Sequence, residues 1–273
     1  MYREEAAPGI PGAVRWASVS RGEGPVRVLP DGCLDLLWSS RSGLLVAGPD
    51  RQAHLSVGVP GERWVGLRLP PGTGPAVFGI PADELRDRRV PLADLWGPAA
   101  AELADRIAAA DARSAGLGRA RHGHAGRPWT GSPAASASRS PSPPPLAGWP
   151  ESSITGVLED VALDRLRAAG GPDPIGTRVA ARLAAGATVA ATAAEVGLGA
   201  RALHRRSRLL FGYGPKTLAR ILRMRRALDL ARSGAPLAEV AVLAGYADQA
   251  HLTREVKELA GVPPTRLLPP AGA

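Results

Sequence analysis

The chain of 273 residues is long enough for two domains, each with its own hydrophobic core. Its single cysteine excludes an internal disulfide and a zinc site built from several cysteines, and no apolar run approaches the roughly 20 residues of a membrane span. The formal net charge of +9 indicates a polyanionic partner. Because the first residues also lack a basic and then apolar signal, we expect a cytoplasmic protein with no membrane association.

The first part of the chain predicts small antiparallel strands. Short apolar runs bounded by Gly, Pro and Asp recur there, which is typical of a half-barrel or a sandwich. The runs cover residues 26–29, 34–38, 44–47, 53–57 and 64–69. Three further elements follow them: a capped helix start at 81–85, a short connecting element at 90–96 and an Ala-rich amphipathic helix at 99–110. We therefore predict a β-rich sensor or dimerisation domain with trailing helices over residues 1–112.

Few side chains in this domain are candidates for chemistry. A metal site of the cupin type needs several histidines and a carboxylate, and His54 is the sole histidine before residue 122, so we expect no metal and no other cofactor. Cys33 is interpreted as a small residue beside a turn, with a redox-sensing thiol as the alternative. Trp16, Trp38 and Trp64 are interpreted as core residues, with the walls of an apolar effector pocket as the alternative.

Residues 113–150 lose all periodicity. The segment is rich in Ser, Ala, Pro, Gly and Arg and lacks the apolar residues that a core requires. We therefore predict a disordered linker. His122 and His124 lie within it and are interpreted as solvated residues of the linker.

Residues 151–273 predict an all-α domain with its core at 175–268. Helical periodicity covers 154–168 and 175–184, and two helix-turn-helix units follow at 188–211 and 237–259. In the second unit, the break at Gly245 precedes Asp248 at an N-cap position. Between the units, Pro215 opens a long helix that would set the two reading helices about one DNA turn, roughly 34 Å, apart.

The outward face of each second helix carries side chains suited to DNA. Arginine, lysine, glutamine and threonine contact base edges and phosphates in the major groove, and arginine does so in a bidentate manner. The predicted DNA-binding residues are Arg201, His204, Arg205 and Arg208 in the first unit and Gln249, Ala250, Thr253, Arg254 and Lys257 in the second.

The positive charge is confined to this region. Residues 175–268 hold 15 Lys and Arg against 6 Asp and Glu, a net of +9, whereas the remainder holds 19 of each, a net of zero. An evenly scattered excess would indicate only a solvated, arginine-rich surface. A localised excess favours nucleic-acid binding with a steep salt dependence.

The C-terminal part resembles the DNA-binding domain of AraC-type regulators over about its last 90 residues. The residues that carry the resemblance are Phe211-Gly212-Tyr213-Gly214-Pro215, Leu218, Arg223, Ala227, Leu230, Ala244-Gly245-Tyr246-Ala247-Asp248, Lys257, Gly261, Pro264 and Arg266. The resemblance implies a seven-helix domain that inserts two recognition helices into successive major grooves. Ser207 departs from the pattern, because the family usually has a buried aromatic ring there. A hydroxyl in a ring-sized slot costs on the order of 3 kcal/mol, so we expect the first unit to be the less stable.

The N-terminal part resembles, more loosely, the reduced cupin-like sensor domain that precedes some AraC-type domains. Three segments carry this resemblance: residues 29–38, residues 47–49 and residues 91–97. It implies a sensing or dimerising module and names no ligand.

The leading hypothesis is a transcriptional regulator, an activator of the AraC type, that is not an enzyme. It would bind double-stranded promoter DNA and contact RNA polymerase, with an N-terminal domain that senses an unknown small molecule or forms a homodimer. The alternative is a ligand-independent DNA-binding adaptor that acts through RNA polymerase or a partner and lacks a ligand cavity. A DNA alkylation repair enzyme with an AraC-like domain needs a cysteine cluster, and the single cysteine excludes it.

Overall fold

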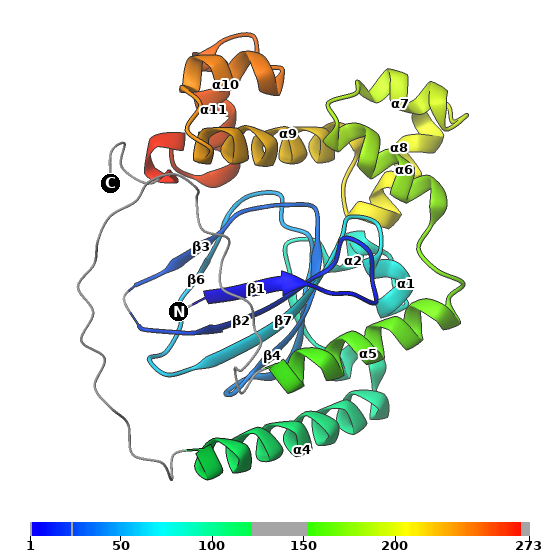
Figure 1. Ribbon diagram of the computed structural model, residues 1–273. Helices are drawn as coiled ribbons and strands as arrows, with labels where there is room; N and C mark the ends of the chain where they lie inside the picture. Colours follow the sequence, from blue (N-terminus) through cyan, green and yellow to red (C-terminus); the bar gives the residue numbers. More distant parts are fainter. Residues whose placement is uncertain (1, 23, 122–151, 269–273) are drawn as a thin grey trace, which may run out of the picture.

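The computed structural model describes residues 2–22, 24–121 and 152–268. A β-rich N-terminal domain is followed by an all-helical C-terminal domain, and helices from the middle of the chain flank the sheet (Figure 1). Within these ranges, no helix combines the length and the apolar character that crossing a bilayer requires.

Six strands form one antiparallel sheet in the order β1-β2-β7-β4-β5-β8. They are β1 (Tyr2–Ala6), β2 (Val14–Val19), β4 (Leu34–Ser39), β5 (Gly43–Ala47), β7 (Arg63–Leu69) and β8 (Arg89–Pro91). Two short strands, β3 (Val26–Val28) and β6 (His54–Ser56), form a separate antiparallel pair. Because side chains alternate along a strand, the register that pairs Leu36 with Leu67 and Leu37 with Gly66 gives the sheet two distinct faces.

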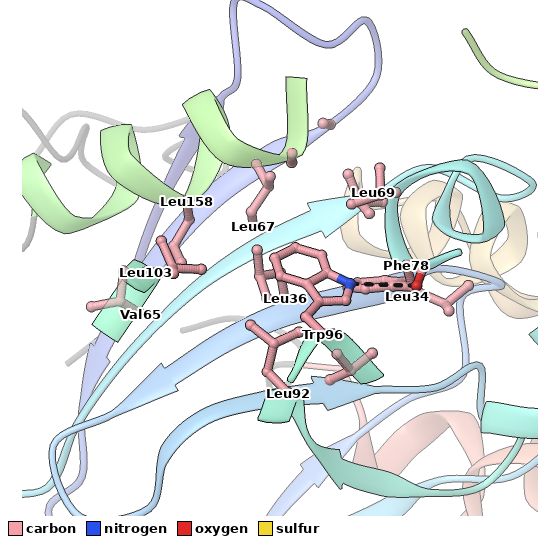
Figure 2. Packing of buried hydrophobic residues seen from close by; sticks show 14 of the residues in the cluster. Leu34, Leu36, Val65, Leu67, Leu69, Phe78, Leu92, Trp96, Leu103 and Leu158 are labelled. Atoms are coloured by element: carbon pink, nitrogen blue, oxygen red, sulfur yellow. Dashed lines mark hydrogen bonds between the residues drawn. The ribbon is translucent and has the colours of Figure 1, made fainter. Parts of the chain in front are cut away.

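One face of the sheet forms the N-terminal core. Leu34, Leu36, Val65 and Leu67 are fully buried there, against several helices (Figure 2). The helices that contribute to this core are α1 (Gly74–Phe78), α2 (Ala82–Leu85), α3 (Leu92–Trp96), α4 (Pro98–Arg121) and α5 (Ser152–Ala168). The Trp96 indole donates a hydrogen bond of 3.3 Å to the carbonyl oxygen of Phe78, which satisfies the one polar atom of this buried ring (Figure 2).

Helix α5 corrects the predicted domain boundary. The sequence places residues 151–168 with the DNA-binding domain, but Ile154, Leu158 and Ala162 are fully buried in the N-terminal core. The spacing of four residues puts them on one helix face, and Glu159 accepts a hydrogen bond of 2.6 Å from the backbone of Gly9. The N-terminal domain therefore includes a helix from beyond the predicted linker.

The predicted linker also begins later than expected. Helix α4 continues to Arg121, so residues 113–121 are helical, in keeping with their content of Ala and Arg, which favour helix. The remainder of the predicted linker, with His122 and His124, lies outside the described residues.

Up to residue 268, where the described residues end, the C-terminal domain contains six α-helices and a 3₁₀ turn, η1 (Pro264–Arg266). The helices are α6 (Pro174–Ala184), α7 (Val189–Glu195), α8 (Ala200–Phe211), α9 (Pro215–Arg232), α10 (Leu237–Ala244) and α11 (Gln249–Ala260). In Figure 1, α9 runs between the α7–α8 unit and the α10–α11 unit. A second hydrophobic core, separate from the first, joins these helices.

The two domains contact each other at both ends of the helical domain. At one end, helix α2 (Ala82–Leu85) lies beside α8, and Arg86 donates a hydrogen bond of 2.9 Å to the carbonyl oxygen of Gly212. At the other end, Arg27 of β3 donates a hydrogen bond of 2.7 Å to the carbonyl oxygen of Ala260, and the backbone N–H of Ala53 donates one of 2.7 Å to Leu259. Both helix-turn-helix units therefore touch the N-terminal domain.

Candidate nucleic-acid interface

The first unit consists of α7, a glycine turn and α8. The Thr188 hydroxyl accepts a hydrogen bond of 3.1 Å from the Ala191 N–H and so caps α7. Gly197 has a φ of +68°, a left-handed conformation that glycine adopts without strain and that turns the chain toward α8. Gly199 stands at the N-cap of α8 and offers no side-chain cap.

The second unit repeats this plan with α10 and α11. Gly245 ends α10 with a φ of +82°, and the Asp248 carboxylate caps α11 by accepting a hydrogen bond of 2.6 Å from the His251 N–H. Leu252 and Val256 are buried on the inner face of α11. A side chain thus caps the N-terminus of α11 but not that of α8, and this is the end that approaches base edges in helix-turn-helix proteins.

Arginines of α9 hold the second unit and the end of α6 in place. Arg223 forms a two-oxygen ion pair with Glu255 of α11, with a shortest distance of 2.6 Å, and Arg220 adds a contact of 2.9 Å to the same carboxylate. Arg226 donates hydrogen bonds of 3.0 Å and 2.6 Å to the carbonyl oxygens of Ala184 and Ala244. These carbonyls end α6 and α10, where a cation is stabilised by the helix dipole.

Sequence periodicity missed Glu255 as a structural residue. Its side chain is only 6% exposed, although a carboxylate is rarely buried unless it is paired. The helical spacing does indicate its burial, because Glu255 falls three residues after Leu252 and four before Leu259, on the inner face of α11. Burial raises the pKa of the Glu255 carboxyl, but hydrogen bonds from Arg223 and Arg220 outweigh it and hold the pKa below its ordinary value.

The structure places the predicted DNA-binding side chains on the outer faces of α8 and α11. All of them are exposed except Thr253, which is half-buried. Two are engaged within the protein: Arg208 pairs with Asp83 of α2 at 2.9 Å, and the His204 ring lies against Gly214, where an added Cβ would stand 2.6 Å from Cε1. The N-terminal domain therefore holds Arg208, one of the side chains predicted to contact DNA.

Much of the positive charge of this domain is used internally. Arg182, Arg206, Arg220, Arg223 and Arg232 form ion pairs with carboxylates. In contrast, four cations of the reading helices make no ion pair or hydrogen bond with another described residue. They are Arg201, Arg205, Arg254 and Lys257. The two reading helices therefore keep four cations that can meet DNA, and Arg178, Lys216, Arg225 and Arg266 elsewhere in the domain are also without such a partner among the described residues.

Ser207 lies on the inner face of α8 and is 1% exposed, and its hydroxyl has no hydrogen-bond partner among the described residues. We expect Ser207→Ala to stabilise the protein by about 1 kcal/mol, because a buried donor without a partner is removed with little loss of volume. The melting temperature of the full-length protein measures this. Ser233→Ala serves as the control, because the exposed Ser233 hydroxyl is satisfied by a hydrogen bond of 2.7 Å to Leu230. A lower melting temperature for Ser207→Ala would contradict the prediction.

The second face of the N-terminal sheet borders a cavity of about 560 Å³. The β3–β6 pair covers this cavity, and its walls contain both aromatic and charged side chains, among them Trp16, Trp64 and Arg68. The sequence favours Trp16 and Trp64 as core residues, with the walls of a pocket as the alternative. In the structure both line this cavity. Cys33 also lines the cavity, and burial, followed by the charge of Asp31, raises the pKa of its thiol, which works against the thiolate that a redox sensor needs.

Two family models match the chain. A helix-turn-helix domain model covers residues 192–268, and a domain of unknown function, DUF6597, covers residues 13–91. No curated protein matches the chain.

Several solved structures are similar to the chain. A probable AraC family transcriptional regulator from Rhodopseudomonas palustris shares 21% identity with a TM-score of 0.31, over 36% of this chain and 100% of that chain. ToxT from Vibrio cholerae shares 7% identity with a TM-score of 0.44, over 97% of this chain and 96% of that chain. A second ToxT structure, bound to a naphthalenyl butenoic acid, shares 9% identity with a TM-score of 0.41 over the same shares of the two chains.

All of these TM-scores are below 0.5, so the assignment rests on the domain matches and on the two helix-turn-helix units described above. The matched C-terminal domain is a helix-turn-helix domain, which is a DNA-binding fold. The chain therefore joins an N-terminal DUF6597 domain to a C-terminal helix-turn-helix domain of the AraC type, the DNA-binding domain of transcriptional regulators.

Proposed function

We propose that the protein is a sequence-specific regulator that places α8 and α11 in successive major grooves of promoter DNA. The observation that carries this proposal is the set of four reading-helix cations without a partner in the described part of the chain, Arg201, Arg205, Arg254 and Lys257. Two reading helices on one rigid α9 support recognition of a bipartite site. RNA polymerase contact, a homodimer and a cytoplasmic location belong to the same proposal.

Selection of binding sites from a random DNA pool at two salt concentrations tests this function. A motif with two parts about one helical turn, roughly 10 base pairs, apart is the expected result. Weaker binding at the higher salt concentration is expected for any phosphate contact and does not by itself indicate specificity. Recovery of no motif would leave only non-specific polyanion binding and would contradict the proposal.

Arg254 is the exposed cation nearest the start of α11 without an internal partner. We expect Arg254→Ala to weaken binding to the selected site by about 1 to 3 kcal/mol and to relax base preference at one position. Titration of the selected site and of single-base variants measures both effects. Arg41→Ala, which removes an exposed arginine from the N-terminal domain, is the control for loss of charge. Unchanged affinity and preference would remove Arg254 from the interface.

We propose further that the N-terminal domain senses a small molecule in its cavity. A volume of about 560 Å³ lies within the range typical of small-molecule sites. The β3–β6 pair that covers the cavity is also bonded to the end of α11, through Arg27 and Ala53, which offers a direct route from ligand to reading helix. This cavity favours the sensor over the ligand-independent adaptor, for which no cavity is expected.

The contact between Asp83 and Arg208 gives a test of how the domains interact. If Arg208 contacts a DNA phosphate, its ion pair with Asp83 must first break. We therefore expect Asp83→Asn to tighten DNA binding. The gain should be about threefold, because an exposed ion pair contributes up to about 1 kcal/mol. The double variant with Arg208→Ala should lose this gain. If Asp83→Asn leaves the affinity unchanged, Arg208 does not compete for DNA.

A further inference from the structure

The cavity of the N-terminal domain contains an incomplete charge cluster. Asp31 and Asp35 both lie beside one guanidinium, with Arg68 Nε at 3.3 Å and 3.4 Å from their nearest oxygens. Arg89, also in the wall, is already balanced by two hydrogen bonds of 2.6 Å to Asp50. Two carboxylates thus share one arginine at close range, because the third arginine of the lining, Arg21, is exposed and forms no ion pair with a described residue.

The same wall presents three aromatic rings. The Trp16 indole lies flat on Gly66, where an added Cβ would stand 2.3 Å to 2.6 Å from ring atoms, so this glycine allows the ring to line the cavity. Its N–H donates a hydrogen bond of 3.0 Å to Asp35 Oδ1, which places the ring beside the carboxylate. Tyr2 lies 5.9 Å from Trp16 between ring centroids, and Trp64 completes the aromatic lining.

No cation of a described residue lies over these three rings. In the part of the chain that the structure describes, arginine guanidinium groups lie over the rings of Trp38, Trp96 and Tyr246, and none lies over the cavity rings. Aromatic faces next to a buried carboxylate are the arrangement that binds organic cations, since the ring face and the carboxylate both attract positive charge. Burial raises the pKa of Asp35; Arg68 opposes this shift and Asp31 adds to it. A cation in the cavity would reduce the repulsion between the carboxylates of Asp31 and Asp35.

We propose that this cavity binds an organic cation with an apolar or aromatic body, held by Asp35 and Asp31 and by the faces of Trp16, Trp64 and Tyr2. The proposal rests on the sensing role above and names the chemical class of its effector. An anion is disfavoured, because it would bring a third negative charge to the one guanidinium of Arg68. Arg21, at the mouth, is exposed and well screened by solvent.

Two ions of the same shape and opposite charge test the proposal without DNA. Tetraphenylphosphonium and tetraphenylborate are titrated separately into the full-length protein, and binding is followed by calorimetry and by tryptophan fluorescence. We expect tetraphenylphosphonium to bind at least about tenfold more tightly than tetraphenylborate. Equal affinities, tighter binding of the borate or no binding of the phosphonium would overturn the proposal.

Asp35→Asn removes the charge while its amide oxygen can still accept the Trp16 hydrogen bond. We expect it to weaken tetraphenylphosphonium binding about tenfold. Asp111→Asn is the matched control, because Asp111 pairs with Arg63 outside the cavity lining. If Asp35→Asn does not melt cooperatively, Asp31→Asn provides the same comparison. Equal losses in the cavity variant and the control would count against the proposal.

The outcome is separable from the proposed regulatory function. Tight phosphonium binding that leaves the affinity for the selected DNA site unchanged supports the cation site and contradicts the sensing role. Conversely, failure to select any DNA motif contradicts the regulatory function, and the phosphonium titration still decides what the cavity binds.

Discussion

Glu255→Gln should lower the free energy of unfolding by about 2 to 3 kcal/mol. The carboxylate is buried and pairs with Arg220 and Arg223, so the neutral amide leaves Arg223 with no carboxylate partner and Arg220 with the exposed Glu258 alone. Both guanidinium groups also reach solvent, which keeps the loss below that of a fully buried pair. A fall of roughly 10 °C in the melting temperature is expected, together with weaker DNA binding because α11 loses its attachment to α9.

Glu258→Gln is the control for this substitution. Glu258 accepts a hydrogen bond of 2.6 Å from the same Arg220, but its side chain is 57% exposed, so its loss should change stability by less than about 0.5 kcal/mol. The pH dependence follows from the lowered pKa of Glu255: its contribution is fully present above the ordinary pKa of 4.5 and is lost as the pH falls through the lower pKa of the folded protein. Equal melting temperatures for the two variants would mean that Glu255 does not hold α11.

Gly66→Ala should expel the Trp16 ring from its place on the sheet. A Cβ at 2.3 Å from the indole cannot be accommodated, so the ring must rotate and its hydrogen bond to Asp35 must break. We expect a loss of about 2 kcal/mol of stability and a changed near-ultraviolet dichroism of tryptophan. The affinity of the Gly66→Ala protein for tetraphenylphosphonium should also be lower than that of the unsubstituted protein.

Gly156→Ala is the matched control for Gly66→Ala. Nothing lies within 4 Å of a Cβ built at Gly156 of α5, so this substitution should be neutral or slightly stabilising. A Gly66→Ala protein with unchanged tryptophan dichroism and wild-type stability would show that the ring does not lie on the sheet as described.

The helices of the C-terminal domain were predictable because their signals are local. Caps such as Thr188 and Asp248, breaks at glycine and apolar residues at helical spacing fix α7 to α11 nearly residue by residue. Five strands of the N-terminal domain were also predicted from short apolar runs. β1 and β2 were missed because their Arg and Glu residues interrupt the alternation of apolar residues. β8 was missed because it has one apolar residue besides a proline, and the pattern there predicted a connecting element at 90–96.

The features that could not be predicted depend on contacts between distant segments. Arg208 has the pattern of a DNA contact, and only the fold brings Asp83 to it from 125 residues away. The periodicity of α5 shows a buried face but not the partner of that face, and the charge count of residues 175–268 does not distinguish arginines that bind helix ends from those that face solvent. The cavity, likewise, arises from the register that puts Trp16 on Gly66.

Hydrogen bonds from Arg27 and Ala53 attach the cover of the cavity to the last turn of α11. The cover is therefore in contact with the DNA-binding domain as well as with the cavity. Thermodynamic linkage is reciprocal: if a ligand in the cavity changes the affinity for an operator by some factor, the operator changes the affinity for the ligand by the same factor. DNA is then itself an effector of the N-terminal domain. Molecules bound to an operator and molecules free in solution would therefore respond to different concentrations of the same compound.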